Sequence, residues 1–244
     1  MTGSLLSSPL VRSLYELVYP PVCLNCEAYF AGHGTKICSV CWSSIRSIST
    51  TDELFVEMKS RLTVGGNLSG LVSAFHFEKE GTLQLLIHEL KYNEMTGVGV
   101  ELGKKLGGNL RAFLGDIELA GIIPVALHPA KKRERGYNQA EFVAEGIQKV
   151  TGLPVLPSLM KRKKNTRTQT KLNLEERQEN VSEAFEVNRR HLPRIKGSSF
   201  ILVDDVITTG ATIQECAHVL KKNGAANVYA ASVALADHAV VGLI

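Results

Sequence analysis

The chain has 244 residues, 44% of them hydrophobic and 21% charged, with a formal net charge of +4. This composition is typical of a globular protein, with enough length for one main domain and a small appendage. It argues against a membrane span, because no apolar run is long enough to cross a bilayer. The first ten residues lack the basic start and apolar run of a secretory signal, so we expect a cytoplasmic protein. The mild positive charge favours anionic partners, and a phosphorylated small molecule would suit it as well as nucleic acid would.

Four of the five cysteines form two C-x-x-C pairs, which follow a helix expected before residue 20. The two pairs are separated by eleven residues, and their members are Cys23, Cys26, Cys38 and Cys41. Two pairs at this distance can present four thiolates tetrahedrally, so we expect a structural Zn²⁺ site. The zinc would hold together a segment that is too small to have its own core. Two disulfides are the alternative, which the lack of a signal sequence disfavours.

His33 and Trp42 are two further candidate residues in this segment. His33 lies between the two pairs and is a spare ligand. Trp42 follows Cys41 and is able to stack a base, although packing beside the metal site is the simpler role. The expected zinc finger is therefore a candidate docking surface for a partner protein or for DNA. The fifth cysteine, Cys216, is expected to pack in the core.

The next elements are a strand over residues 71–77 and two helices over 81–92 and about 98–114, according to their apolar spacing. Residues 51–70 fit neither pattern clearly. Lys91 lies at the end of the first helix, where lysines often complement the helix dipole. It is also a candidate for binding an anionic substrate.

A short apolar run over 121–127 predicts a buried strand, in which Pro124 marks a bulge or the end. A polar loop is expected over 128–137, before a helix over 138–150. Arg133 and Arg135 in this loop can each clamp a phosphate or a pyrophosphate. A solvated basic turn before a helix is the alternative interpretation.

Residues 161–171, KRKKNTRTQTK, contain no apolar side chain, so a mobile and exposed loop is expected there. A short helix is expected over 172–180. Three interpretations of the loop stay open: a lid that closes over a substrate, a contact for a nucleic-acid backbone, and a merely solvated face. Arg167 is a candidate catalytic residue under the first of them.

The most informative stretch runs from residue 198 to residue 235. Apolar residues at 200–203 predict a buried strand that ends in Asp204 and Asp205, at the edge where open α/β sheets bind ligands. A Thr/Gly-rich phosphate cradle follows, at Thr208, Thr209, Gly210, Ala211 and Thr212. A helix over 210–223 and a strand over 227–235 complete the pattern.

Each residue type in this stretch has a chemical reason. Backbone N–H groups at a helix start bind phosphate, and Gly210 permits a tight turn with close approach of a ligand. Asp204 and Asp205 suit the two neighbouring hydroxyls of a ribose, and carboxylates also stabilise a sugar cation during displacement. A strand end followed by a helix cap is the alternative, but two aspartates with this cradle are a much rarer combination.

Strands that alternate with helices indicate a parallel α/β sheet. We expect residues 1–50 to form an N-terminal helix with a finger similar to a double zinc ribbon, and residues 51–244 to form the α/β domain.

The sequence VDDVITTGAT at 203–212 is similar to the motif with which type I phosphoribosyltransferases bind 5-phosphoribosyl-1-pyrophosphate (PRPP). The resemblance implies a type I phosphoribosyltransferase-like sheet flanked by helices. It also implies that Asp204 and Asp205 contact the ribose 2- and 3-hydroxyls, that residues 208–212 hold the 5-phosphate, and that Mg²⁺ accompanies PRPP. The segment 122–139 resembles the position of the pyrophosphate loop in these enzymes.

Four further stretches resemble the ComF family, over roughly residues 15–236. They are the run from His128 to the R-x-R-G-Y-N-Q of 133–139, the Lys-Tyr segment at 90–92, a T-x-x-Q…R-x-x-N…A-F pattern over 166–185, and the cysteine pairs. The sequence departs from the family pattern at 126–128, where Ala-Leu-His stands in place of a Pro-Leu-His type sequence.

Membership of this family implies a role in natural competence and DNA uptake, with handling of incoming single-stranded DNA. A competence helicase or another DNA-handling protein is then an expected partner. The alternative is an active phosphoribosyltransferase that transfers phosphoribose from PRPP to an unidentified base or amine. No acceptor pocket can be identified in the sequence, so both hypotheses stay open.

Overall fold

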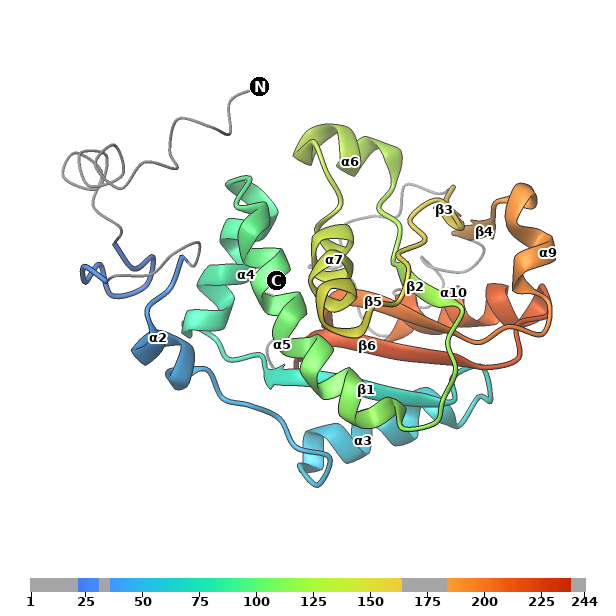
Figure 1. The fold of residues 1–244 in the computed structure, drawn as a ribbon, viewed down its shortest axis with the longest axis horizontal. Coiled ribbons are helices and arrows are strands. Elements are labelled where there is room, and N and C mark those ends of the chain that lie inside the picture. Colours follow the sequence, from blue (N-terminus) through green and yellow to red (C-terminus); the bar gives the residue numbers. More distant parts are fainter. Residues whose placement is uncertain (1–21, 31–35, 164–183, 238–244) are drawn as a thin grey trace.

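Four parallel strands form the central sheet of the computed structural model, which describes residues 22–30, 36–163 and 184–237 (Figure 1). Their order across the sheet is β1-β6-β5-β2. The strands are β1 (Gly70–His76), β2 (Gly121–Pro124), β5 (Phe200–Ile207) and β6 (Val228–Leu235). The predicted parallel α/β sheet is confirmed, because every neighbouring pair in it is parallel.

The strands read as continuous apolar runs because helices cover both faces of the sheet. One face packs against α4 (Thr82–Tyr92), α5 (Thr96–Leu114) and α7 (Gln139–Thr151). The other face packs against α3 (Glu53–Thr63) and α10 (Ala211–Lys222). The ambiguous stretch 51–70 therefore contains a helix, whose Phe55, Met58 and Leu62 are buried.

Short extended segments lie along both outer strands. On the β1 side, Ile48 donates its N–H to the carbonyl of Ala74 at 3.1 Å, and His76 donates to Arg46 at 3.0 Å. On the β2 side, Ile122 donates to Pro154 and Leu156 donates to Ile122, both at 2.8 Å. The ladder hydrogen bonds of the sheet thus continue beyond its four strands.

Helices α5 and α7 meet backbone to backbone. A Cβ on Gly103 would lie 2.1 Å from the Val143 carbonyl oxygen, and one on Gly146 would lie 2.2 Å from that of Val100. Neither position has room for a side chain. The basic segment 128–137 directly precedes α7. The close crossing of α5 and α7 therefore fixes the position of the end of this segment.

The predicted polar loop over 128–137 is wrong, because α6 (Pro129–Arg135) occupies most of it. His128 caps this helix by accepting the Ala130 N–H at Nδ1, 3.2 Å away, and Gly136 ends it in the left-handed conformation with φ 79°. No helical period of apolar residues is present over this stretch, because α6 buries no residue. Pro124 does end β2, as one of the two expectations for it allowed.

Two other boundaries differ from the predictions. β3 (Met160–Arg162) pairs in antiparallel fashion with β4 (Phe185–Val187), so residues 161 and 162 belong to a strand rather than to a loop. β5 continues to Ile207, so both aspartates lie within it. Three short helices complete the described residues: α2 (Ser39–Ser44), η2 (Arg189–His191) and α9 (Leu192–Ile195).

The predicted N-terminal helix and the helix over 172–180 lie outside the described residues. Among the described helices, none combines the length and apolar character that crossing a membrane requires.

Candidate functional site

Asp204 and Asp205 lie near the carboxyl end of β5, the second of the two inner strands of the sheet. The two neighbouring carboxyl groups lie close enough to interact with each other. Asp205 is buried, whereas Asp204 is half-buried. Each carboxylate is also tied to the chain, since Asp204 Oδ1 accepts the N–H of Asp205 and Asp205 Oδ1 accepts that of Val206, both at 2.9 Å.

Lys91, at the end of α4, reaches Asp205 across the face of the sheet. Its Nζ lies 2.9 Å from Asp205 Oδ2, and the two side chains are only 9% and 8% exposed. Water is therefore largely excluded from this ion pair, which makes its attraction stronger than that of a surface pair. The sequence singled out both residues but did not place them together.

The two aspartates differ in their pKa values. Burial, and then the charge of Asp205, raise the pKa of Asp204 well above its usual range. Burial would also raise the pKa of Asp205, but the nearby ammonium of Lys91 outweighs it and holds that pKa below its usual value. The two carboxyl groups therefore titrate apart, with Asp205, which Lys91 faces, losing its proton at the lower pH.

The cradle after β5 is shaped by a glycine. Gly210 adopts φ 78° as the N-cap of α10, and a Cβ there would lie 2.3 Å from a methyl group of Leu62. The N–H of Ala211 approaches Thr209 Oγ1 at 3.4 Å. The start of α10 therefore presents backbone donors and threonine hydroxyls next to the aspartates, the arrangement that binds phosphate.

Helix α3 supports this cradle through two hydrogen bonds, a role that the sequence did not reveal. Arg61 donates from Nη2 to the carbonyl of Thr208 at 3.0 Å, and Gln214 of α10 donates from Nε2 to the carbonyl of Arg61 at 3.1 Å. The signal was absent because residues 51–70 showed no clear period and Arg61 stands far from the motif in the chain.

Helix α6 holds the predicted arginines. Arg135 is half-buried, lies over the ring of Tyr92 at 5.2 Å, and donates to Gln139 Oε1 at 3.1 Å. Arg133 is exposed. In this structure neither arginine is paired with the aspartates.

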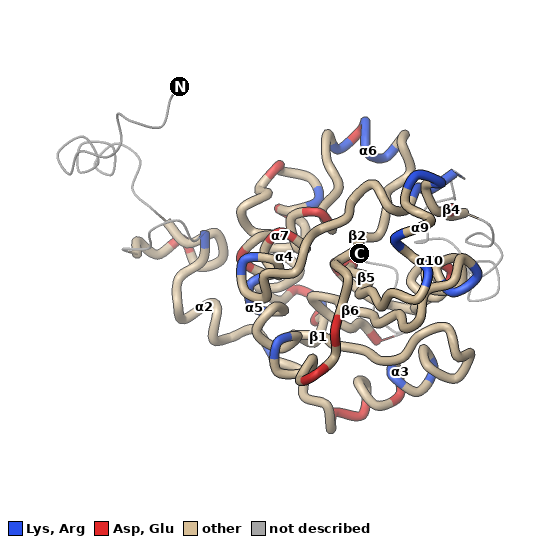
Figure 2. The backbone as a smooth tube through the Cα atoms, turned by 45° about the vertical axis from the view of Figure 1, so that its right-hand side comes forward, with Lys and Arg blue, Asp and Glu red and all other residues tan. Residues whose placement is uncertain are grey.

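Two further basic side chains, one on α6 and one on β3, interact with the charges of this region. Lys131 of α6 is half-buried, and its pKa is lowered by burial and then by the charges of Arg162 and Arg135. Burial lowers the pKa of Arg162 on β3, while the negative charge of Asp204 opposes this shift. Arg162 thus interacts with Asp204, and Lys131 adds positive charge beside Arg162 and Arg135. Figure 2 shows basic residues on α6 and on the side of the molecule near β4, α9 and α10.

Several sequence-based candidates are left without a structural position. Arg167 and most of the predicted loop 161–180 lie outside the described residues, as does His33. Trp42 is half-buried, with the ammonium of Lys105 5.5 Å from its ring centre. Cys216 is fully buried in the core, as expected.

The four paired cysteines come together as predicted. Their Sγ atoms all lie within 4.8 Å of one another, and those of Cys26 and Cys38 are 3.8 Å apart. A tetrahedral zinc site with Zn–S bonds of about 2.3 Å separates its sulfur atoms by about 3.8 Å. The described cysteines form no disulfide. The cluster can therefore hold a metal ion such as zinc.

Hydrogen-bond donors from the backbone and from the Asn25 side chain point at two sulfur atoms of the cluster. The N–H of Cys38 donates to Cys23 Sγ at 3.4 Å, and the amide of Asn25 donates to Cys41 Sγ at 3.3 Å. Burial opposes ionisation of Cys23, but the neighbouring N–H groups lower its pKa to about 6. Donors aimed at sulfur are the usual surroundings of thiolate metal ligands.

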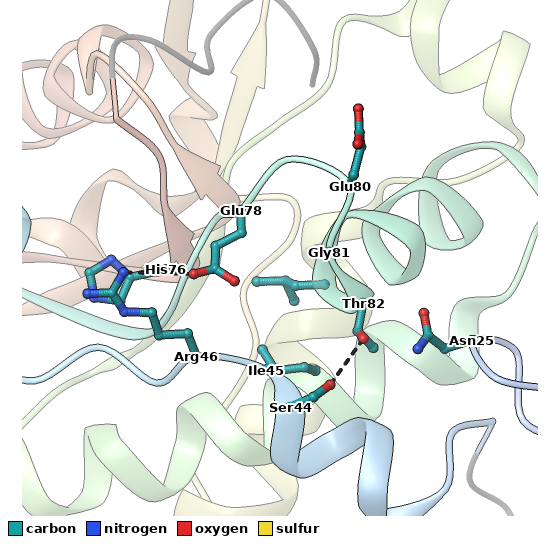
Figure 3. Close-up of a pocket in the computed structure, with 10 residues that line it drawn as sticks. Asn25, Ser44, Ile45, Arg46, His76, Glu78, Glu80, Gly81 and Thr82 are labelled. Atoms are coloured by element: carbon teal, nitrogen blue, oxygen red, sulfur yellow. Dashed lines mark hydrogen bonds and ion pairs between the residues drawn. The ribbon is translucent and has the colours of Figure 1, made fainter.

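A polar pocket of about 230 Å³ lies where the cysteine segment meets the carboxyl end of β1 (Figure 3). Ser44 of α2 and Thr82 at the start of α4 share a hydroxyl hydrogen bond of 3.2 Å across it. Arg46 and Glu78 form an exposed ion pair at 3.8 Å. These contacts join the cysteine segment to the sheet at β1, which β6 separates from β5.

Comparison with known proteins agrees with this geometry. The model of the phosphoribosyl transferase domain family matches residues 136–240, which include β5, the aspartates and the cradle. The chain is 28% identical over 214 residues to Competence protein F of Haemophilus influenzae, covering 83% of this chain and 91% of that protein.

Two other relatives extend the match. The chain is 30% identical over 226 residues to DNA utilization protein YhgH of Escherichia coli O157:H7, covering 87% of this chain and 96% of that protein. It is 30% identical over 105 residues to Competence protein ComFC of Bacillus subtilis, covering 43% of this chain and 40% of that protein. With its phosphoribosyltransferase-type sheet and its N-terminal four-cysteine cluster, the chain belongs to the ComF family.

Proposed function

We propose that the protein binds PRPP at the carboxyl end of β5. The observation that carries this proposal is the position of Asp204 and Asp205, with Lys91 balancing the charge of Asp205. They stand a few residues before a cradle that requires a glycine at 210. The ribose hydroxyls donate to the two carboxylates. The 5-phosphate accepts from the backbone and the threonines of residues 208–212.

The pyrophosphate of PRPP then lies toward α6, where its negative charge meets basic side chains. Lys131, Arg133 and Arg135 supply this charge on α6, and we place Arg167 in the same role from the segment after β3. Mg²⁺ arrives with PRPP and is held by its pyrophosphate oxygens. Lys91 belongs to the site through Asp205.

For the biological role, we propose that the protein acts in natural competence and DNA uptake, in the cytoplasm, by handling incoming single-stranded DNA. This rests on the names of its relatives, two of which are competence proteins and one a DNA utilization protein. Lys and Arg positions gather near β4, α9 and α10, and such positive charge is suited to a phosphate backbone (Figure 2). A competence helicase or another DNA-handling protein is the proposed partner.

The alternative is an active phosphoribosyltransferase. Attack at the anomeric carbon would break its bond to pyrophosphate, form a bond to a base or an amine, and release pyrophosphate with Mg²⁺. The observation that favours it is the carboxylate on Asp205, which is placed to stabilise positive charge developing on the sugar.

We also propose that residues 1–50 form a separate N-terminal unit and residues 51–244 the phosphoribosyltransferase-like domain. Zinc in the cysteine cluster would have a purely structural role, since four thiolates fill its coordination and leave no position for a substrate.

Thermal unfolding with and without PRPP and Mg²⁺ tests the PRPP proposal. A ligand that binds only the folded state raises the midpoint, by an amount that grows with its concentration. The double variant Asp204→Asn, Asp205→Asn should lose this shift, whereas the exposed Asp116→Asn should keep it. No shift in the unchanged protein, or an equal shift in the double variant, would sink the proposal.

Two further assays separate the roles. Pyrophosphate release across base and amine acceptors identifies an active transferase. Binding of single-stranded DNA should weaken steeply with salt if the backbone is recognised. DNA binding with no release of pyrophosphate supports the competence role, and release with an acceptor supports the enzyme.

A further inference from the structure

The ion pair of Lys91 differs from the other lysine pairs near the site in its burial. Both of its side chains are less than a tenth exposed, whereas Lys132 and Glu141 form a pair whose side chains are 50% and 33% exposed. Burying a lysine is costly, so a lysine is kept inside only where a partner compensates its charge. The partner here is one of the two carboxylates of the proposed ribose subsite.

The charge of the proposed ligand explains why one carboxylate needs a basic partner. PRPP carries several negative charges on its phosphates, and two uncompensated carboxylates would repel it. The ammonium of Lys91, at the end of α4, compensates the charge of Asp205.

Lys91 also fixes the direction of the carboxylate. Asp205 Oδ2 lies 2.9 Å from Lys91 Nζ, and Oδ1 accepts the N–H of Val206 at 2.9 Å. Both oxygens of the carboxylate are thus held in a fixed direction. A carboxylate oriented before the ligand arrives loses less entropy on binding.

The turn that carries Lys91 is itself anchored on both sides. The carbonyl of Leu90 accepts a hydrogen bond from the hydroxyl of Tyr137, and the ring of Tyr92 lies under the guanidinium of Arg135. Of the three consecutive residues 90–92, the middle one thus contacts β5, and the other two contact the segment 128–137. The resulting support keeps Nζ in place although lysine side chains are flexible.

We propose that Lys91 is a positioning residue: it orients Asp205 toward a ribose hydroxyl and cancels its charge, so that an anionic sugar phosphate can approach the aspartate pair. This inference rests on the proposed PRPP function. It assigns Lys91 to the ribose subsite and not to the pyrophosphate subsite at α6.

Two probes separate the subsites: ribose 5-phosphate, and inorganic pyrophosphate with Mg²⁺, each titrated by calorimetry into the full chain. In Lys91→Met the affinity for ribose 5-phosphate should fall at least about tenfold, the usual effect of losing a charged partner. The affinity for pyrophosphate should change less than about threefold. Lys104→Met is the matched control, since it removes an exposed lysine that pairs with Glu101 at 2.7 Å, and it should leave both affinities unchanged.

The ratio of the two losses decides the matter. Parallel losses for both probes would show that Lys91 only supports the fold, and an unchanged affinity for ribose 5-phosphate in folded Lys91→Met would equally overturn the proposal. Failure of the proposed function looks different, because the unchanged protein would then bind neither PRPP nor ribose 5-phosphate.

A second comparison covers the case in which Lys91→Met does not fold. Adding Lys91→Met to Asp205→Asn removes both charges together, a change that buried pairs often tolerate. If Lys91 acts through Asp205, the double variant should bind ribose 5-phosphate as Asp205→Asn alone does. A further tenfold loss would mean that Lys91 contacts the ligand itself and would overturn the positioning role.

Discussion

The aspartate site and the cysteine cluster are organised by different means. At the end of β5, the fold itself holds the charges: Lys91 neutralises Asp205 at 2.9 Å, and both lie beneath packed helices. In the cysteine segment four sulfur atoms gather within 4.8 Å of one another, and ionised thiolates this close would repel without a cation. The comparison teaches that the charge of Asp205 is balanced by a side chain of the same chain, whereas four ionised thiolates would require a bound cation to balance theirs.

Metal removal should break this comparison most clearly. Structural zinc sites bind with apparent free energies of about 10–16 kcal/mol, and this energy maintains the local fold. A chelator should therefore abolish amide hydrogen-exchange protection around the cysteine segment, at residues 36–45, while the residues of β5 keep theirs. Equal protection in both regions after metal loss would contradict the contrast.

Cys216→Ala provides the control for metal content. Cys216 lies in the core and outside the cluster, so the variant should bind the same amount of zinc as the unchanged protein. A loss of zinc in this variant would place Cys216 among the ligands.

Gly210→Ala should have the next largest effect, on the aspartate side. A side chain there requires a positive φ and meets Leu62, so we expect a loss of about 1–3 kcal/mol in the free energy of unfolding, together with weaker PRPP binding. Urea unfolding measures the first and calorimetry the second. Gly197→Ala is the matched control, because it has a similar φ of 75° but open space, and it should cost less and leave PRPP binding unchanged.

Replacing each aspartate by asparagine should change the free energy of unfolding in opposite directions. The pKa of Asp204 is raised, so its contribution to stability is present below its unfolded pKa of about 4 and is lost as the pH rises through the folded value. Asp204→Asn should therefore stabilise the protein at pH 7 by about 0.5–2 kcal/mol, as removal of functional strain often does.

Asp205 has the opposite sign. Its pKa is lowered, so its contribution is present above pH 4 and is lost as the pH falls through the folded value. Asp205→Asn should be destabilising at pH 7, with the difference shrinking toward pH 3. Urea unfolding across this pH range would refute the charge assignment if both variants shifted stability in the same direction.

Tyr137→Phe should have the smallest effect. It removes one hydrogen bond to the Leu90 carbonyl, which is worth about 0.5–1.5 kcal/mol. Because this bond anchors the turn that carries Lys91, affinity for ribose 5-phosphate should fall slightly. Tyr29→Phe serves as the control, since this tyrosine is 63% exposed, and calorimetry of both variants provides the check.

The sequence was most informative where one period dominates. The apolar runs of β5 and β6 and the helical spacing of α4 predicted buried elements correctly, because their residues face a continuous core. Helix α6 was missed because it buries nothing and owes its helical form to the cap at His128. Amphipathic period reports burial, so an exposed helix leaves little trace of it.

The candidate site was predictable in its parts but not in its assembly. The aspartates and the cradle stand in one motif, so their proximity follows from the chain. Lys91 meets Asp205 only because the tertiary fold brings the end of α4 within reach of β5, and Arg61 supports Thr208 from a helix with no clear pattern. Such contacts depend on tertiary packing, which a single sequence does not encode in any local period.

The extended segment along β1 links the two regions in a further way. Residues 46–48 follow the cysteine cluster directly and occupy hydrogen-bonding groups of an outer strand. An uncovered outer strand is a template for pairing with other chains, and proteins commonly shield it. Oxidation or metal loss at the cysteines should therefore favour aggregation through β1, so an intact cluster would help to keep this outer strand from pairing with other chains.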